Sequence, residues 1–193
     1  MKKKQRLIVG ISGASGAMYG IRLLEVLQDT DIETHLVISK AASITIPEET
    51  KYTVKQVQAL ADVNYASGDI AAACSSGSFK TMGMVVAPCS VKTMSEIAGG
   101  ITTGLLTRAA DVVMKEQRKL VLMVRESPLH LGHLRRMAAL AEMGVIIAPP
   151  MPAFYPQPKT IEDIINHSVG RVLDLFDIDA GLVKRWAGLK PSR

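Results

Sequence analysis

Five strand-like segments alternate along the chain with segments of helical periodicity, and this alternation limits the fold more than any other feature. The strand-like segments cover residues 7–11, 33–38, 84–87, 120–124 and 145–148. Most are short apolar runs, which are typical of strands buried on both faces. Alternation of such strands with helices predicts an α/β fold with a doubly wound parallel sheet.

The segments between these strands have lengths and apolar spacing typical of helices. A chain of 193 residues that is 48% hydrophobic suits one domain with a substantial core, and no linker or internal repeat divides it. The segment 62–80 is polar and rich in small residues, and its loosest part is expected at residues 75–78. The expected helices cover residues 21–27, 41–61 with an interruption near Pro47, 92–98, 103–116, 130–143 and 160–176.

The net charge of +5 comes from the two ends of the chain. Without the eight basic residues of these tails, 15 basic residues face 18 acidic ones, so residues 7–183 carry about −3. No basic stripe with interleaved aromatic residues accompanies the tails, and we expect no nucleic-acid partner. The tail residues are Lys2, Lys3, Lys4, Arg6, Lys184, Arg185, Lys190 and Arg193.

The cysteines and histidines favour a cytoplasmic protein without a metal site. Cys74 and Cys89 lack CxxC spacing, which indicates a reducing compartment. The basic start has no signal-peptide core, and no apolar run reaches membrane length. His130 and His133 share a helix face, but no HExxH-like partner accompanies them. We therefore expect neither a membrane association nor a bound metal.

The first strand-like segment leads through Ser12-Gly-Ala-Ser-Gly16 into a helical segment. Small residues at such a turn let an anion approach backbone N–H groups and the positive end of a helix dipole. Gly10, Gly13 and Gly16 form GxxGxxG, which differs from the dinucleotide pattern GxGxxG, and no Walker lysine follows. The pattern leaves two interpretations, a phosphate-binding turn and a plain tight turn.

The segment at residues 84–87 also ends in residues suited to an anion. Ser90 and Thr93 can cap the next helix or donate hydroxyls to phosphate, and Lys92 adds positive charge. A capping serine beside a solvated lysine explains the same residues equally well. Cys89, beside them, is either a reactive thiol or a small core residue.

The segment at residues 120–124 ends in adjacent charges, Arg125 and Glu126, before Pro128. Charges are costly in a protein interior, so the two side chains should face a crevice or pair with each other. Ligands of open α/β sheets bind beyond the carboxyl ends of the strands. Three such ends with polar or charged residues therefore predict one shared site.

Four more residues have both a structural and a functional interpretation. Arg108 and Lys115 share a helix face, which by default is a solvated one. Arg171 interrupts an apolar stripe, either as part of an ion pair or as a phosphate clamp. Tyr155 lies in a loop with five prolines in ten residues, where it can pack or take part in hydrogen bonding and proton transfer.

Taken together, these segments resemble the UbiX-type flavin prenyltransferases, formerly called aromatic acid decarboxylases. The resemblance extends from Ile8 to Trp186, and its parts are specific only in combination. They are GISGASG at 10–16, Ser39-Lys40, PCSVKT at 88–93, LTRAADV at 106–112, VRESPLH at 124–130 and PAFY at 152–155.

The resemblance implies a flavodoxin-like or Rossmann-like single domain over residues 1–193, with basic tails. Members of this family transfer a dimethylallyl group from dimethylallyl phosphate to reduced FMN without a metal. The prenylated FMN serves UbiD-type decarboxylases. FMN binds at subunit contacts, typically in homododecamers, so the resemblance also implies a homo-oligomer.

The resemblance also assigns roles to individual residues. FMN-binding residues are Gly13, Ala14, Ser15, Ser39, Ser90, Val91, Lys92, Thr93 and Arg125. Residues that bind the prenyl phosphate are Lys115, Tyr155 and Arg171, with Arg108 of a neighbouring subunit, while Trp186 closes over the site. Catalytic residues are Glu49, Lys115, Glu126 and Tyr155, with Glu49 and Glu126 assisting proton movements.

Two other functions remain open at this point. One is an FMN-dependent decarboxylase of phenolic or aromatic acids. Such an enzyme would not need several cationic side chains suited to phosphate. The other is a non-catalytic flavin-carrying subunit, against which Tyr155 and Arg171 argue. The loop at 150–155 lacks the asparagine of the PxMNxxMW-like motif found in cysteine decarboxylases of this fold. This argues against decarboxylation of a peptidyl cysteine.

Overall fold

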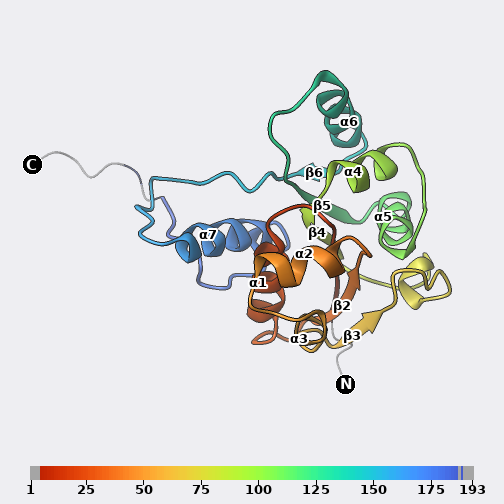
Figure 1. The fold of residues 1–193 in the computed structure, drawn as a ribbon, viewed down its shortest axis with the longest axis horizontal. Helices are drawn as coiled ribbons and strands as arrows, with labels where there is room; N and C mark the ends of the chain where they lie inside the picture. Colours follow the sequence, from red (N-terminus) through yellow and green to blue (C-terminus); the bar gives the residue numbers. More distant parts are fainter. Residues whose placement is uncertain (1–4, 187, 189–193) are drawn as a thin grey trace, which may run out of the picture.

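A six-stranded parallel sheet forms the centre of the computed structural model, which describes residues 5–186 and residue 188 (Figure 1). The strand order is β3-β2-β1-β4-β5-β6, and every pair is parallel. This order reverses between β1 and β4, as in Rossmann-type sheets. The strands are β1 Arg6–Ile11, β2 Glu33–Ile38, β3 Val63–Tyr65, β4 Gly83–Cys89, β5 Lys119–Val124 and β6 Ile146–Ile147.

Helices cover both faces of the sheet (Figure 1). One face carries α1 Ala17–Leu27, α2 Ala42–Glu49, α3 Val54–Gln58 and α7 Ile161–Asp174. The other face carries the 3-10 helix η1 Ala73–Ser75, α4 Val91–Ala98, α5 Leu105–Lys115 and α6 Leu131–Glu142. The expected doubly wound α/β fold is confirmed.

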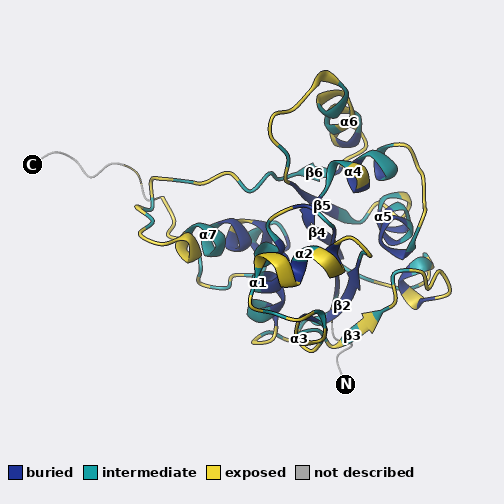
Figure 2. Cartoon of the chain, viewed as in Figure 1, coloured by how far each residue is buried: buried dark blue, intermediate teal, exposed yellow. Residues whose placement is uncertain are grey.

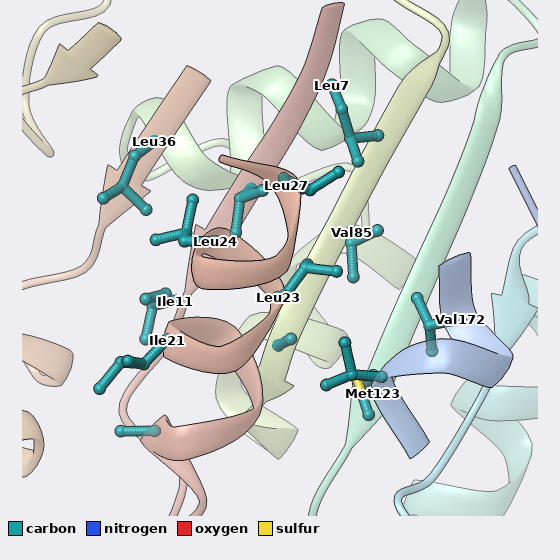
Figure 3. Close-up of a cluster of buried hydrophobic side chains, with 14 of the residues drawn as sticks. Leu7, Ile11, Ile21, Leu23, Leu24, Leu27, Leu36, Val85, Met123 and Val172 are labelled. Carbon is teal, nitrogen blue, oxygen red and sulfur yellow. The ribbon is translucent and has the colours of Figure 1, made fainter. Parts of the chain in front are cut away.

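Side chains of β1 supply the two cores alternately, because successive residues of a strand point to opposite faces. Leu7, Val9 and Ile11 pack in the cluster with α1 and α7, and Ile8 packs in the cluster with α4 and α5. Figure 3 shows Leu7 and Ile11 with the leucines of α1. The dark strands in Figure 2 show that the middle of the sheet is buried on both sides.

Two details of the local structure differ from the expectations. Residues 62–80 are not wholly irregular, because Val63–Tyr65 forms the edge strand β3 beside β2. The helix after β2 continues through Pro47 and ends at Glu49, so the interruption falls at residues 50–53.

Within the described residues, no helix is both long and apolar enough to cross a membrane. The same part of the chain contains no cluster of three or more His, Cys, Asp or Glu side chains arranged for a metal. Of the basic tail residues, Lys2, Lys3, Lys4, Lys190 and Arg193 lie outside the described residues.

Candidate functional site

The carboxyl ends of β1 and β4 are joined through the buried hydroxyl of Ser12. Its Oγ donates to the Pro88 carbonyl at 2.9 Å and accepts from the Ser90 backbone N–H at 2.7 Å. The Ser12 backbone N–H also donates to Pro88, at 3.2 Å. The strand order reverses between these two strands, and a crevice forms at such a point in open α/β sheets.

A pocket of about 380 Å³ opens beside this junction. We call it the hydroxyl pocket, because serine and threonine side chains from four segments contribute to its wall. These segments are the end of β2, the loop that contains Ser67, and the starts of α4 and α5. Residues in the wall include Gly13, Ser39, Ser90, Lys92, Thr93 and Thr107. The five predicted FMN-binding residues among these six therefore lie together.

Helix capping fixes two hydroxyls of this pocket. The Ser90 Oγ accepts from the Thr93 backbone N–H at 3.2 Å and donates to the Thr93 Oγ1 at 3.1 Å. The Ser39 Oγ accepts from the Ala42 backbone N–H at 3.1 Å. Local capping therefore orients Ser90 at the start of α4 and Ser39 before α2.

Lys92, one of two lysines in the wall of the hydroxyl pocket, forms an ion pair within α4. The Lys92 Nζ donates to the Glu96 Oε1 at 2.7 Å, one helical turn along α4. The same Glu96 oxygen accepts from the Thr103 Oγ1 at 3.0 Å. Lys92 is 76% exposed, so this ion pair is weak and the side chain is free to reorient towards a ligand.

The helix end at the first turn is capped by the chain itself. The Glu49 Oε2 accepts from the backbone N–H groups of Gly16 at 2.7 Å and Ala17 at 3.3 Å. A carboxylate suits this position because the amino end of a helix is positive. Glu49 therefore lies at the predicted site. Its carboxylate, however, accepts hydrogen bonds from the α1 amides that a phosphate would use in a phosphate-binding turn.

Gly13 is needed at the first turn for close packing. A Cβ at this position would lie 2.3 Å from the Cβ of Ala41, so no larger residue fits without movement of the turn or of the start of α2. Of the other predicted flavin residues nearby, Ala14 is buried, Ser15 is exposed, and Val91 begins α4. These three are absent from the wall of the hydroxyl pocket.

A second hollow, of about 720 Å³, lies between α7 and the C-terminal segment. We call it the arginine pocket, and its wall consists of Tyr155, His167, Arg171, Val183, Arg185 and Trp186. It brings together three residues predicted to contact the prenyl donor, Tyr155, Arg171 and Trp186. The rings of Tyr155 and Trp186 meet edge to face with centroids 5.9 Å apart.

Tyr155 has a hydrogen-bond partner inside the arginine pocket. Its Oη lies 3.0 Å from the Nε2 of His167. Burial, with a contribution from the Arg171 guanidinium, lowers the pKa of His167. His167 is therefore neutral at pH 7 and can either accept from the phenol or donate to it.

The predicted donor residues of α5 do not join the arginine pocket within one protomer. Arg108 donates to Asp111 at 2.8 Å and Lys115 to Glu116 at 2.6 Å. Both lie on the sheet face opposite to α7 (Figure 1). Lys115, at the carboxyl end of α5, is about 12 Å along the helix axis from Thr107.

The charged residues after β5 do not pair with each other. The Arg125 backbone N–H donates to the Cys89 carbonyl at 3.0 Å, and the Glu126 Oε1 accepts from the Ser127 backbone N–H at 3.0 Å. Both side chains lie at the carboxyl edge of the sheet, outside the walls of both pockets. Cys89 is fully buried, and burial raises the pKa of its thiol, so the core interpretation of this cysteine holds.

Several residues of these pockets were missed by the sequence analysis, among them His167, Arg185 and Glu96. His167 lies four residues before Arg171 and thus on the same face of α7, which was an available signal. Arg185 was counted only as part of a basic tail. Glu96 in the hydroxyl pocket lies four residues after Lys92, where an ion pair is common.

Comparison with known proteins places the chain in a family. It matches the family described as Flavoprotein over residues 1–177. The flavin prenyltransferase UbiX of Escherichia coli (strain K12) is 62% identical over 187 residues, covering 95% of this chain and 99% of that protein.

Two solved structures agree with this match. AnUbiX (PadA1), crystallised with FMN and dimethylallyl pyrophosphate, superposes with a TM-score of 0.96 at 49% identity, covering 97% of this chain and 100% of that one. A dodecameric FMN-dependent UbiX-like decarboxylase from Escherichia coli O157:H7 gives a TM-score of 0.94 at 52% identity, covering 95% and 100%. The chain therefore belongs to the flavoprotein family and, within it, to the UbiX-type flavin prenyltransferases.

Proposed function

We propose that this protein transfers a dimethylallyl group from dimethylallyl phosphate to reduced FMN, and that the prenylated FMN serves a UbiD-type decarboxylase. The observation that carries the proposal is the presence of two pockets with different chemistry. The hydroxyl pocket suits a flavin mononucleotide, and the arginine pocket suits a phosphate ester. The similarity to AnUbiX, which was crystallised with FMN and a dimethylallyl donor, supports this pairing.

The hydroxyl pocket fits FMN in size and in the groups it offers. Its volume of about 380 Å³ falls within the range of small-molecule sites. Hydroxyls of Ser39, Ser90 and Thr93 can bind the phosphate and ribityl groups, while Leu106 gives the wall an apolar part. We assign FMN binding to these residues with Gly13, Ala14, Ser15, Val91, Lys92 and Arg125.

Because Glu49 occupies the amides of α1, we place the phosphate nearer to Ser90 and Thr93 than to the first turn. When bound and reduced, FMN supplies the electron-rich ring that accepts the allyl group. The protein holds the donor so that its allylic carbon faces that ring.

The residues of the arginine pocket act on the leaving phosphate. As the allylic C–O bond breaks, its electron pair goes to the phosphate, and negative charge grows there. Arg171 and the Tyr155 hydroxyl stabilise that charge by hydrogen bonds. Trp186 covers the allyl group, while Glu49 and Glu126 accept and donate protons.

We further propose that neighbouring subunits complete the site. Arg108 and Lys115 both lie on the opposite face of the sheet from Arg171, so we assign both of them to a neighbour's phosphate. A homododecamer like that of the Escherichia coli O157:H7 relative provides such contacts. We also propose one flavoprotein domain over residues 1–193 and a cytoplasmic location, in keeping with two free cysteines.

The decisive experiment is mass spectrometry of the flavin released after the purified protein is incubated anaerobically with reduced FMN and dimethylallyl phosphate. We expect FMN plus one dimethylallyl unit. Oxidised FMN is the control and should stay unmodified, because its ring is electron-poor. Unmodified flavin in both samples would contradict the proposal and leave a flavin-carrying subunit. Loss of carbon dioxide from a phenolic acid, with unmodified flavin, would instead support a decarboxylase.

A further inference from the structure

Two arginines, not one, face the pocket beside Tyr155. The wall contains Arg171 from α7 and Arg185 from the C-terminal segment, and the two side chains are 55% and 56% exposed. The aspartates that pair with them, Asp174 and Asp179, are absent from this wall. The wall of the pocket therefore contains both arginines and neither of the aspartates.

Asp174 holds both guanidinium groups at once. Its Oδ2 accepts from the Arg171 Nη1 at 2.7 Å and from the Arg185 Nη1 at 3.1 Å, and its Oδ1 accepts from the Arg185 Nη2 at 2.9 Å. Only 16% of its side chain is exposed. This bidentate pairing fixes the plane of the Arg185 guanidinium and places the arginine next to Arg171.

Most N–H donors of the two arginines stay unused by Asp174. Each guanidinium has five donors, of which Arg171 uses one here and Arg185 uses two. The contact of Arg185 with Asp179 is longer, at 3.6 Å, and Asp179 is 75% exposed, so water weakens this pair. The remaining donors can bind the oxygens of a phosphoryl group.

We propose that Arg185 is a second phosphate-binding arginine of the arginine pocket, and that Asp174 is the positioning residue that orders Arg185 and Arg171 for the phosphate end of the allyl donor. The inference rests on the proposed function, since it names a further residue of the same donor site. A planar guanidinium fork suits phosphoryl oxygens, so both monophosphate and diphosphate ends are candidate ligands.

The protein offers a direct probe of this pocket, because Trp186 is its single tryptophan and forms part of the wall. The purified flavin-bound protein is titrated with inorganic phosphate and, separately, with pyrophosphate, and the Trp186 fluorescence is recorded. We expect Arg185→Ala to weaken binding of the tighter-binding anion at least about tenfold. We expect Asp174→Asn to weaken it about fivefold or more, because both arginines lose their common anchor.

Lys184→Ala is the matched control. Lys184 is the preceding residue, carries the same charge and lies in the wall of a different hollow, with Gln157 and Gly181. Its removal should change anion binding by less than about twofold. Arg185→Lys keeps the charge beside Asp174 but loses the fork, and its affinity should fall between those of wild type and Arg185→Ala.

The steady-state kinetics should agree with the titration. For both Arg185→Ala and Asp174→Asn we expect a raised KM for dimethylallyl phosphate and an unchanged Kd for FMN. Anion binding by Arg185→Ala or Arg185→Lys that equals wild type would overturn the inference. The same holds if Lys184→Ala weakens binding as much as Arg185→Ala, because the effect would then be one of net charge. If the wild type binds anions through Arg185 but forms no prenylated flavin, the proposed function fails and the anion site stands.

Discussion

His35 is a buried titratable residue outside the two pockets, and polar and aromatic side chains surround it. It is 3% exposed, its Nε2 lies 2.8 Å from the Glu33 Oε1, and its Nδ1 lies 2.9 Å from the Tyr65 Oη. The Phe79 ring packs edge-on, with centroids 4.9 Å apart. A neutral imidazole that donates from Nε2 to Glu33 and accepts at Nδ1 from Tyr65 satisfies every partner.

This arrangement predicts lower stability in mild acid. Burial lowers the pKa of His35 more than the Glu33 carboxylate raises it. In the unfolded chain the histidine pKa is about 6.5. Below that pH the unfolded chain therefore binds a proton more readily than the folded chain does. We expect the free energy of unfolding, measured in urea, to be fully retained above pH 6.5 and to fall as the pH drops below it.

His35→Gln is the control for this pH dependence. Glutamine can still hydrogen-bond but does not titrate, so the curve of unfolding free energy against pH should flatten between pH 7 and 5. Part of the slope should remain, because burial also lowers the pKa of His167. An identical slope in the variant would mean that His35 does not cause it.

At the scale of elements, α7 is the helix on which the arginine pocket depends, and its start is fixed by a capping box. The Thr160 Oγ1 accepts from the Asp163 backbone N–H at 3.1 Å, and Asp163 accepts from the Thr160 backbone N–H at 2.9 Å. The backbone N–H groups of Lys159 and Thr160, which both donate to the Asp163 carboxylate at 2.9 Å, lower the pKa of that carboxyl group. His167 and Arg171 follow one and two turns later on α7.

Thr160→Ala should lower the free energy of unfolding by about 1 kcal/mol, because one amide at the start of α7 loses its acceptor. Thr160→Ser keeps that acceptor and should stay near wild type. Denaturant unfolding of both variants measures the difference, and the Kd for FMN should not change in either. Equal stability of Thr160→Ala and wild type would show that the capping box does not hold α7 in place.

The sequence predicted those elements whose apolar pattern is strong, and missed those that long-range contacts decide. The strand at residues 33–38 matches β2, and the expected helix at 92–98 differs from α4 by one residue. The edge strand β3 is only three residues long, and side-chain bonds between Thr34 and Asp62, at 2.8 to 3.0 Å, fix the chain beside it. No local pattern encodes that contact.

Pro47 shows the same limit within a helix. It falls in the second half of the eight-residue α2, so the carbonyl of Ser43 lacks its helical donor. Ser43 is exposed, and water can satisfy that carbonyl, while Ile46 is buried and anchors the turn. Proline does disfavour a helix at this position, but the burial of Ile46 stabilises the helical turn around it.

The candidate site likewise has a part that the sequence predicts and a part that it does not. Ser39, Ser90 and Thr93 come together in one pocket because parallel strands end at one edge, which follows from topology. The capping of α1 by Glu49 joins residues 33 positions apart, and the pairing of Arg185 with Asp174 joins residues 11 positions apart. Spacing along the sequence does not reveal such pairs.

At the scale of the whole molecule, the residues assigned to the prenyl phosphate lie on opposite faces of one sheet. Arg171 belongs to α7, which packs with α1, and Arg108 belongs to α5, which packs with η1 and α4. Figure 1 shows the sheet between α5 and α7. A single protomer cannot bring these side chains to one phosphate without breaking its core, so an active site that uses both needs two chains.

This arrangement predicts complementation between two inactive variants. Arg108→Ala and Arg171→Ala should each lose most prenyl transfer, because each removes a cation from the leaving phosphate. In oligomers formed by co-expression of equal amounts of both variants, a site that takes α5 from one chain and α7 from another is intact in roughly one quarter of cases. We therefore expect about a quarter of wild-type activity, measured as prenylated FMN per chain. A mixture of the two separately assembled variants, whose subunits do not exchange, should stay inactive and serves as the control. If each site were built from a single chain, every chain would carry one defect, and co-expression would restore nothing.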